Sequence, residues 1–192
     1  MKNTNFELPS IGDARRRTKE MAHVERELFT IEDKYKNLGN GRFYFLRTYG
    51  CQANQRDSET IAGIMEQLGY KRVELETEAD VIIMNTCAIR KNAEDKVLGE
   101  IGNLKKLKRA NPDLIIAMCG CMSQEEGIVN EVLAKYPQVD LIFGTHNIYN
   151  LPKLLFNAVM SKEKTVEVFS KEGDIIEALP TTSFMCCKSC CW

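Results

Sequence analysis

The sequence predicts an α/β fold, an open parallel sheet with helices on both faces, of the Rossmann-like or flavodoxin-like kind. From Arg42 onward, short apolar, β-branched or aromatic runs alternate with longer segments of helical periodicity. The short runs are apolar along almost their whole length, which is typical of strands buried on both faces. Alternation of such strands with helices is the pattern of a parallel sheet covered by helices on both sides.

Four strands and four helices are expected in this alternating part of the chain. The predicted strands are residues 43–47, 81–84, 114–118 and 139–143, and the predicted helices are residues 53–68, 90–109, 122–135 and 147–160. The first helix is supported by apolar residues at helical spacing, namely Ile61, Ile64, Met65 and Leu68. Residues 165–169 and 175–176 are predicted to add an edge strand pair after the last helix.

The alternating part, residues 42–160, is expected to be one domain. A charged extension at residues 1–40 precedes it, and the start of a linker at residues 161–180 follows it. Residues 11–38 of the extension are predicted to be partly helical, but no clean apolar face runs through them. Because positive and negative residues nearly balance here, we expect a solvated extension rather than an RNA-binding arm.

The composition is that of an ordinary globular protein of 192 residues, 44% of them hydrophobic and 28% charged. The net charge of −1 gives no global basic footprint for nucleic acid, although a local patch or another domain could supply one. No run approaches the roughly 18 apolar residues of a membrane helix, and the N-terminus lacks the features of a signal peptide. We therefore expect a cytoplasmic, monomeric protein without a membrane partner, whose eight cysteines are thiols or metal ligands.

Three cysteines follow three different predicted strands. Cys51 comes after the first strand, Cys87 after the second and Cys121 after the third, so each lies in a strand-to-helix loop. In a parallel sheet these loops share the carboxyl edge, where open α/β folds place their ligand sites. The three thiols are therefore expected to converge at one edge of the sheet.

Thiolates that converge in this way suit an iron–sulfur cluster, zinc or copper(I). Helix N-termini favour anionic thiolates, and Gly50 and Gly120 let the backbone approach a bulky inorganic group. Structural zinc sites commonly use four ligands with CxxC pairs, so three separate loops better fit a 4Fe–4S cluster with one open iron. Polar neighbours that could hydrogen-bond sulfide or thiolate are Gln52, Asn54, Asn85, Thr86, Ser123 and Gln124.

The residues alone leave other interpretations open. A free cysteine at a strand end is often a core residue, so the domain could be purely structural and take up no iron. Cys119, at the end of the third strand, is expected to be buried and is left out of the site. His146, in the fourth loop, is expected to be a surface or capping residue. No GxGxxG or Walker-type phosphate loop and no Ser–His–Asp pattern occurs in the sequence.

Three motifs around these cysteines resemble the N-terminal domain of the radical-SAM methylthiotransferases. They are residues 48–54 (TYGCQAN) with Asp57-Ser58-Glu59, residues 85–90 (NTCAIR) and residues 119–124 (CGCMSQ). Residues 139–147 fit the same family, and the resemblance covers about residues 42–160. Within the family, the charged extension and the third motif look most like the branch that modifies N6-dimethylallyladenosine in tRNA. The nearest other branch acts on a ribosomal protein.

The resemblance implies a transferase whose cofactors and substrate are divided among domains. Cys51, Cys87 and Cys121 would hold an auxiliary 4Fe–4S cluster whose open iron carries the sulfur that is transferred. A following radical-SAM domain would hold a second 4Fe–4S cluster, cleave S-adenosylmethionine and activate C2 of the adenosine, and a further domain would help to hold tRNA. A sulfur donor or sulfur-carrier protein is a further implied partner, and no catalytic residue is expected in this chain.

The end of the sequence departs from the pattern of that family. Residues 181–192 crowd four cysteines into six residues, and Cys186 and Cys190 have only the first interval of CxxxCxxC. We expect an aberrant terminus rather than a separate metal site, and a truncated chain that does not catalyse methylthiolation alone. The alternative function from another class is a non-catalytic iron–sulfur protein that transfers electrons or carries clusters.

Overall fold

The computed structural model describes residues 26–87, 91–161, 164–168, 175–177 and 179–181. Six strands form one sheet in which all neighbouring pairs are parallel, in the order β3-β2-β4-β5-β6-β7. Their bounds are β2 (Phe43–Thr48), β3 (Lys71–Arg72), β4 (Val81–Thr86), β5 (Ile115–Gly120), β6 (Leu141–Phe143) and β7 (Thr165–Glu167). The predicted open parallel sheet is confirmed.

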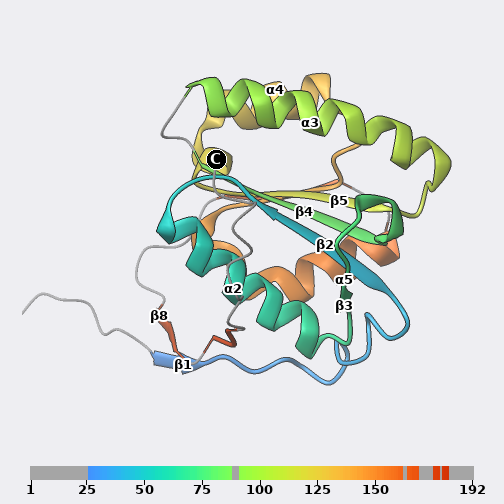
Figure 1. The fold of residues 1–192 in the computed structure, drawn as a ribbon. Helices are drawn as coiled ribbons and strands as arrows, with labels where there is room; N and C mark the ends of the chain where they lie inside the picture. Colours follow the sequence, from blue (N-terminus) through green and yellow to red (C-terminus); the bar gives the residue numbers. More distant parts are fainter. Residues whose placement is uncertain (1–25, 88–90, 162–163, 169–174, 178, 182–192) are drawn as a thin grey trace, which may run out of the picture.

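Helices cover both faces of this sheet (Figure 1). α2 (Gln52–Gln67) and α5 (Leu151–Ser161) lie on one face, and α3 (Lys91–Ala110) and α4 (Glu126–Lys135) lie on the other. Short 3-10 helices are η1 (Glu76–Glu78), η2 (Cys121–Gln124) and η3 (Thr145–Asn150). Within the described ranges, no helix is both long enough and apolar enough to cross a membrane.

Two apolar cores lie between the sheet and its helices, and alternate residues of each strand fill them. In β4, Val81 and Ile83 face α2 and α5, whereas Ile82 and Met84 face α3 and α4. Each of these four side chains is at most 1% exposed. Because burial of a large aliphatic side chain contributes about 1.5–3 kcal/mol, a strand covered on both faces is apolar at successive positions.

The chain connects the strands in the flavodoxin-like order. Counted along the chain from β2, the sheet order is 2-1-3-4-5-6, so the direction of progress reverses between β2 and β4. Loops on the two sides of such a switch point diverge at the carboxyl edge and open a crevice, where α/β proteins bind ligands. The loops that follow β2 and β4 are the ones that carry Cys51 and Cys87.

The four predicted strands and four predicted helices are confirmed, with shifted ends. β4 and β5 each continue two residues further than predicted, because their last residues still pair as backbone partners. The helices predicted at 122–135 and 147–160 begin as the 3-10 helices η2 and η3. The edge strand predicted at residues 165–169 is confirmed as β7, which pairs with β6 at the edge of the main sheet. Its predicted pairing with residues 175–176 is wrong, because β8 (Ile175–Glu177) pairs with β1 (Arg26–Leu28).

The two ends of the chain lie largely outside the described residues, which begin at residue 26 and include none of residues 182–192. The described part of the extension contains β1 and turns at residues 33–41 and no helix; residues 11–25 of the segment expected to be partly helical lie outside the described residues. A segment without an apolar face gains little stability from packing as a helix, and a short helix that does not pack is only marginally stable in water.

The segment that follows the sheet returns to α2. β1 and β8 pair in parallel on the α2 side of the molecule (Figure 1). Leu179 packs against the core shared by α2 and α5. A Cβ on Gly63 of α2 would stand 2.7 Å from the Pro180 carbonyl, so this backbone lies directly on the helix.

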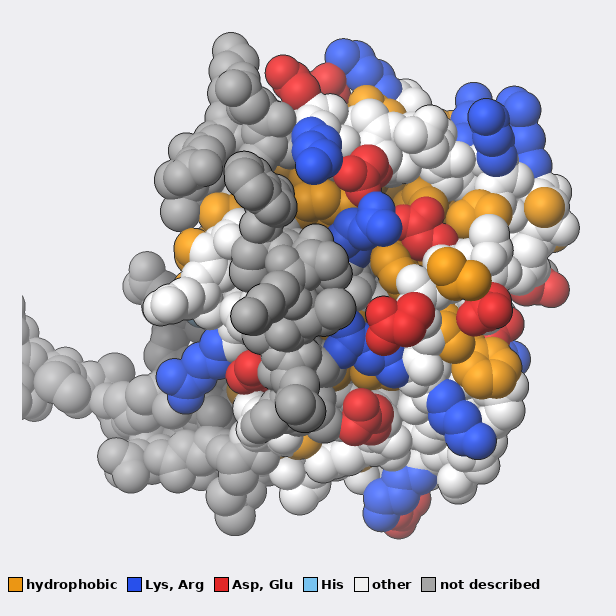
Figure 2. Space-filling model, in the orientation of Figure 1, with side chains coloured by type: hydrophobic (Ala, Val, Ile, Leu, Met, Phe, Trp, Pro, Cys, Tyr) orange, Lys and Arg blue, Asp and Glu red, His pale blue; other side chains and the backbone are white. Residues whose placement is uncertain are grey.

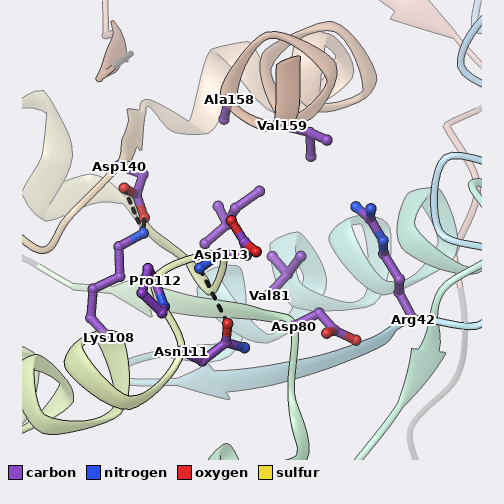
Figure 3. A pocket seen from close by; sticks show the side chains of 11 residues that line it. Arg42, Asp80, Val81, Lys108, Asn111, Pro112, Asp113, Asp140, Ala158 and Val159 are labelled. Carbon is purple, nitrogen blue, oxygen red and sulfur yellow. Dashed lines mark hydrogen bonds and ion pairs between the residues drawn. The ribbon is translucent and has the colours of Figure 1, made fainter. Parts of the chain in front are cut away.

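Charges gather at the amino edge of the sheet, opposite the cysteine loops. A cavity of about 580 Å³ opens there, and its lining includes Arg42, Asp80, Lys108 and Asp140 (Figure 3). The Lys108 ammonium donates to both carboxylate oxygens of Asp140, at 2.8 and 2.9 Å, and Asp140 also accepts from the Ile116 amide at 2.9 Å. These bonds tie α3 to the beginnings of β5 and β6.

Charged side chains of both signs are interspersed on the face shown in Figure 2. Scattered apolar side chains lie among them, and neither sign forms a broad field in that view. This surface agrees with the net charge of −1 and offers no wide basic footprint for nucleic acid.

Two glycines allow the loops at the carboxyl edge to lie directly on one another. Gly120 has a φ of 98°, and a Cβ there would stand 2.1 Å from the Thr86 carbonyl oxygen and 2.6 Å from Oδ1 of Asn85. Gly50 has a φ of 130°, and its Cβ would stand 2.4 Å from the Cβ of Cys87. Only glycine satisfies both the backbone conformation and the close approach at these positions.

We predict that Gly120→Ala lowers the free energy of unfolding by about 3–5 kcal/mol, because the residue is strained at this φ and its methyl group overlaps the Thr86 carbonyl. Gly99→Ala is the matched control, since Gly99 is exposed within α3 and has nothing within 4 Å of where a Cβ would stand. That change should stabilise the protein by about 0.5–1 kcal/mol. Urea denaturation followed by circular dichroism measures both, and equal unfolding midpoints would contradict the packing at Gly120.

Candidate metal centre

The register of the sheet places the three cysteine loops at one level. The carboxyl end of β4 pairs with the carboxyl end of β2 on one side and with that of β5 on the other. Cys51 follows the end of β2 by three residues, whereas Cys87 and Cys121 come immediately after β4 and β5. Cys51 therefore lies on one side of the switch point and the other two on the opposite side, all at the carboxyl edge.

The three thiols are free and differ in exposure. Cys51 is exposed at the N-cap of α2, Cys121 is half-buried at the start of η2, and Cys87 is buried between their loops. The backbone of Gly50 lies against the Cys87 side chain, since a Cβ on Gly50 would stand 3.0 Å from the Cys87 Sγ. The structure thus brings the Cys51 loop into direct contact with Cys87.

Tyr49 anchors the loop that carries Cys51. Its amide donates to the Asn85 carbonyl at 2.7 Å, which fixes the loop to the end of β4. Its hydroxyl donates to Glu100 of α3, and Arg47 donates to the same carboxylate at 2.6 Å. Burial raises the pKa of the Tyr49 hydroxyl above its usual range, and the Glu100 carboxylate that accepts its hydrogen bond adds to that effect. The phenol therefore stays a donor.

The pKa values of the exposed Cys51 thiol and the half-buried Cys121 thiol are shifted in opposite directions. The backbone N–H groups of Asn54 and then Ala53, at the start of α2, lower the pKa of the Cys51 thiol. Burial raises the pKa of the Cys121 thiol, and the negative charges of Cys87, Asp57 and Cys51 add to that effect. The Cys51 thiol therefore ionises at a lower pH than the Cys121 thiol.

Asp57 belongs to the first of the three motifs, but it is not among the site residues that the sequence predicts. Partial burial raises the pKa of its carboxyl, while the positive charge of His146 acts in the opposite direction. Its charge also raises the pKa of Cys119, after the larger effect of burial. The signal that could have found it is helical spacing, because Asp57 lies three residues after Asn54 on α2, about one turn further along the helix.

The six polar neighbours divide into three groups. Asn54, Asn85 and Thr86 are fully buried, and their hydrogen bonds join the loops to one another. Ser123 is also fully buried, and its hydroxyl has no partner in the described structure. The other two, Gln52 and Gln124, are exposed, and Gln124 donates to the Thr145 hydroxyl at 2.9 Å.

Cys119 and His146 lie where the sequence predicts. Cys119 is fully buried in the core shared by α2 and α5, and burial raises its thiol pKa well above the usual value. His146 is exposed on η3. Neither residue joins the three cysteines as a candidate ligand.

The candidate donors of the site are thiols, which as thiolates are soft ligands. Among the residues that the structure describes, no three His, Cys, Asp or Glu side chains stand together as ligands of one ion. The thiolates of a 4Fe–4S cluster each bind a different iron of a larger inorganic group. Three free thiols on neighbouring loops, a buried Ser123 hydroxyl without a partner and the close approach at two glycines fit that larger group.

We predict that iodoacetamide modifies Cys51 first among the four cysteines of the described domain near neutral pH. The thiolate is the reacting form, so a lowered pKa makes Cys51 reactive at a lower pH than an ordinary thiol with a pKa of about 8.5. Cys121, whose pKa is raised, should react only at higher pH, and the buried Cys119 last. Residue-resolved mass spectrometry across a pH series measures this order, with the chain in urea as control; equal rates for Cys51 and Cys121 would contradict it.

Curated relatives from Bacillus match nearly the whole chain. Those from Bacillus pumilus (strain SAFR-032) and Bacillus subtilis (strain 168) are 57% and 56% identical over 172 residues, or 90% of this chain. One from Bacillus cereus (strain AH187) is 54% identical over 175 residues, or 91% of this chain. Each is named tRNA-2-methylthio-N(6)-dimethylallyladenosine synthase. The match covers 34% of each relative, so the chain spans about a third of the length of the curated relatives it matches.

A solved structure of aspartate transcarbamoylase from Trypanosoma cruzi aligns with 83% of this chain and 62% of that chain. The TM-score is 0.24 and the sequence identity is 14%. A likeness this weak carries no argument about fold or function.

A family match covers the part of the chain that holds the site. The family described as "Uncharacterized protein family UPF0004" matches residues 43–144, from the start of β2 to the residue after β6. That range contains all three cysteines and the six polar neighbours, and it is more than half of the chain. The chain belongs to the family UPF0004.

Proposed function

We propose that residues 42–160 form the auxiliary-cluster domain of a tRNA methylthiotransferase, and that Cys51, Cys87 and Cys121 hold its 4Fe–4S cluster. The observation that carries this proposal is the meeting of three cysteine loops at the switch point of a parallel sheet, with a free thiol on each. The donor chemistry supports it, because soft thiolates favour iron–sulfur clusters.

The three cysteines contribute in different ways. When bound, the cluster supplies an iron without a protein ligand, at which a sulfur atom can be held for transfer. Cys51 provides an exposed thiolate that the N-terminus of α2 stabilises. Cys87 would bind the cluster from its buried position between the other two loops. Cys121 would bind it from the half-buried start of η2. Ser123 is the neighbour best placed to donate a hydrogen bond to thiolate or sulfide, because its buried hydroxyl has no other partner.

The substrate class follows from the relatives' name. We infer that the whole enzyme adds a methylthio group at C2 of N6-dimethylallyladenosine in tRNA, using S-adenosylmethionine. The relatives named for this product share 54–57% identity with the chain, which favours the tRNA branch over the ribosomal-protein branch. Because the match covers 34% of each relative, we assign S-adenosylmethionine, the second cluster and most tRNA contacts to the remaining length. A sulfur donor or carrier protein would approach from the exposed side, at Cys51.

We predict that the chain binds a 4Fe–4S cluster on anaerobic reconstitution with iron and sulfide, and that the triple variant Cys51→Ala/Cys87→Ala/Cys121→Ala does not. Cys119→Ala is the matched control, because Cys119 is a buried cysteine two residues from Cys121 and outside the proposed ligand set. Iron content, absorption and EPR spectra measure uptake. In every chain compared, the four tail cysteines from Cys186 to Cys191 are replaced by serine so that the tail contributes no iron.

The same spectra separate the functions. A triple variant that takes up as much cluster as its parent would show that these cysteines are not the ligands. A cluster whose EPR spectrum changes on addition of sulfide or methanethiolate supports sulfur handling at an open iron. An unchanged spectrum with a reversible potential would instead indicate an electron-transfer or carrier protein, and a parent chain without iron uptake would indicate a structural domain.

We predict that this domain works inside a whole synthase. A chimera in which residues 42–160 replace the matching segment of the Bacillus subtilis relative should restore methylthiolated adenosine in tRNA of a strain that lacks the relative. Liquid chromatography with mass spectrometry of digested tRNA measures the nucleoside. The chimera with the triple alanine variant should yield none, and the Cys119→Ala chimera is the control. A folded but inactive parent chimera would count against the assigned function.

A further inference from the structure

Beneath the three cysteines lies a pair of buried amides. Asn54 of α2 and Asn85 of β4 are both fully buried, although amides are costly to remove from water unless they are hydrogen-bonded. Each must therefore find partners inside the protein. Those partners show what the two side chains do.

The two amides bind each other's segments reciprocally. Nδ2 of Asn54 donates to the Thr86 carbonyl at 2.8 Å and to Oδ1 of Asn85 at 3.3 Å. Nδ2 of Asn85 donates to the Asn54 carbonyl at 2.8 Å and to the Ser58 hydroxyl at 2.8 Å. All four N–H groups are used within the protein, so neither amide has a donor left for a cluster. Their hydrogen bonds join the Cys51 helix to the Cys87 loop.

The third loop rests on the same pair. The Thr86 hydroxyl donates to the Cys119 carbonyl at 2.6 Å, immediately before Gly120 and Cys121. Gly120 itself lies so close to Oδ1 of Asn85 that a Cβ would stand 2.6 Å from it. The segments that carry all three cysteines therefore meet at the two amides.

We propose that Asn54 and Asn85 form an amide latch, a positioning pair that holds the three cysteine loops in register so that a bound cluster keeps its three ligands. The inference rests on the proposed function and goes beyond it, because it assigns the geometry of the site to two residues whose amide donors all bind other parts of the protein; Oδ1 of Asn54 also accepts from the Cys51 thiol at 3.5 Å. A fully bonded buried network favours one arrangement of the loops. Groups that orient metal ligands in this way typically change metal affinity about 10- to 100-fold when they are removed.

The test compares iron release from the reconstituted chain, with its tail cysteines replaced by serine, in the variants Asn54→Ala and Asn85→Ala. Gln138→Ala is the matched control: Gln138 is a buried amide that donates to the Ile101 carbonyl at 2.9 Å, on the α3 and α4 side of the sheet. Thr86→Val is a milder latch variant of nearly the same size, for use if an alanine variant does not fold. Urea unfolding of each apoprotein shows how much stability is lost.

We expect about 10- to 100-fold faster iron release to a chelator from the latch variants than from Gln138→Ala, with an altered EPR spectrum. The double variant should release iron no faster than the faster single variant, because the two amides act as one unit. In the apoproteins, hydrogen exchange of the peptides around Cys51 and Cys87 should increase in the latch variants and not in Gln138→Ala. Release and spectra equal to the control would overturn the latch and leave the cluster assignment intact. A parent chain that binds no cluster would overturn the proposed function, and the exchange data would then still decide whether the amides hold the loops.

Discussion

The site depends on the parallel register of β2, β4 and β5. Because the carboxyl ends of these strands are backbone partners, the loops that follow them begin at one level, and the reversal between β2 and β4 opens space there. A shift of one residue in one strand would carry its cysteine away from the others and turn its core side chains to the opposite face. The register is held by the cores on both faces, so the packing that stabilises the sheet also fixes the relative positions of Cys51, Cys87 and Cys121.

The loops meet through contacts that leave little freedom. Gly120 lies against the Thr86 backbone, and Gly50 lies against Cys87. The buried side-chain amides of Asn54 and Asn85 donate hydrogen bonds to backbone carbonyl groups of these segments. Loss of any hydrogen-bond partner in this buried network would lower the stability of the fold, since a buried donor without an acceptor costs about 1–3 kcal/mol. The three cysteine loops are therefore held in one arrangement by the protein itself. Among the described residues of the three cysteine loops, Ser123 has a buried hydroxyl without a partner, two residues after Cys121 on η2.

Much of this arrangement could be predicted from the sequence, because continuous apolar runs such as residues 81–84 identify buried strands and the cysteines follow three of them. β3 escaped prediction because its two residues, Lys71 and Arg72, are charged and exposed. β1 and β8 are far apart in the sequence, and neither an apolar run nor a hydrophobic periodicity predicts that they pair. The bonds between Asn54 and Asn85 also link residues 31 apart, so the sequence marked both as neighbours of the thiols but did not reveal that they bind each other.

The contrast between Cys119 and Cys121 shows why position decides the role of a cysteine here. Cys119 is the last side chain of β5 before Gly120 and points into the core shared by α2 and α5, where burial keeps it a neutral thiol. Gly120, at a φ of 98°, then turns the chain out of the strand. Cys121 follows at the half-buried start of η2, where the charges of Cys51 and Cys87 act on it. One glycine conformation therefore separates a core residue from a candidate ligand, and it does so at the point where the third loop contacts the amide latch.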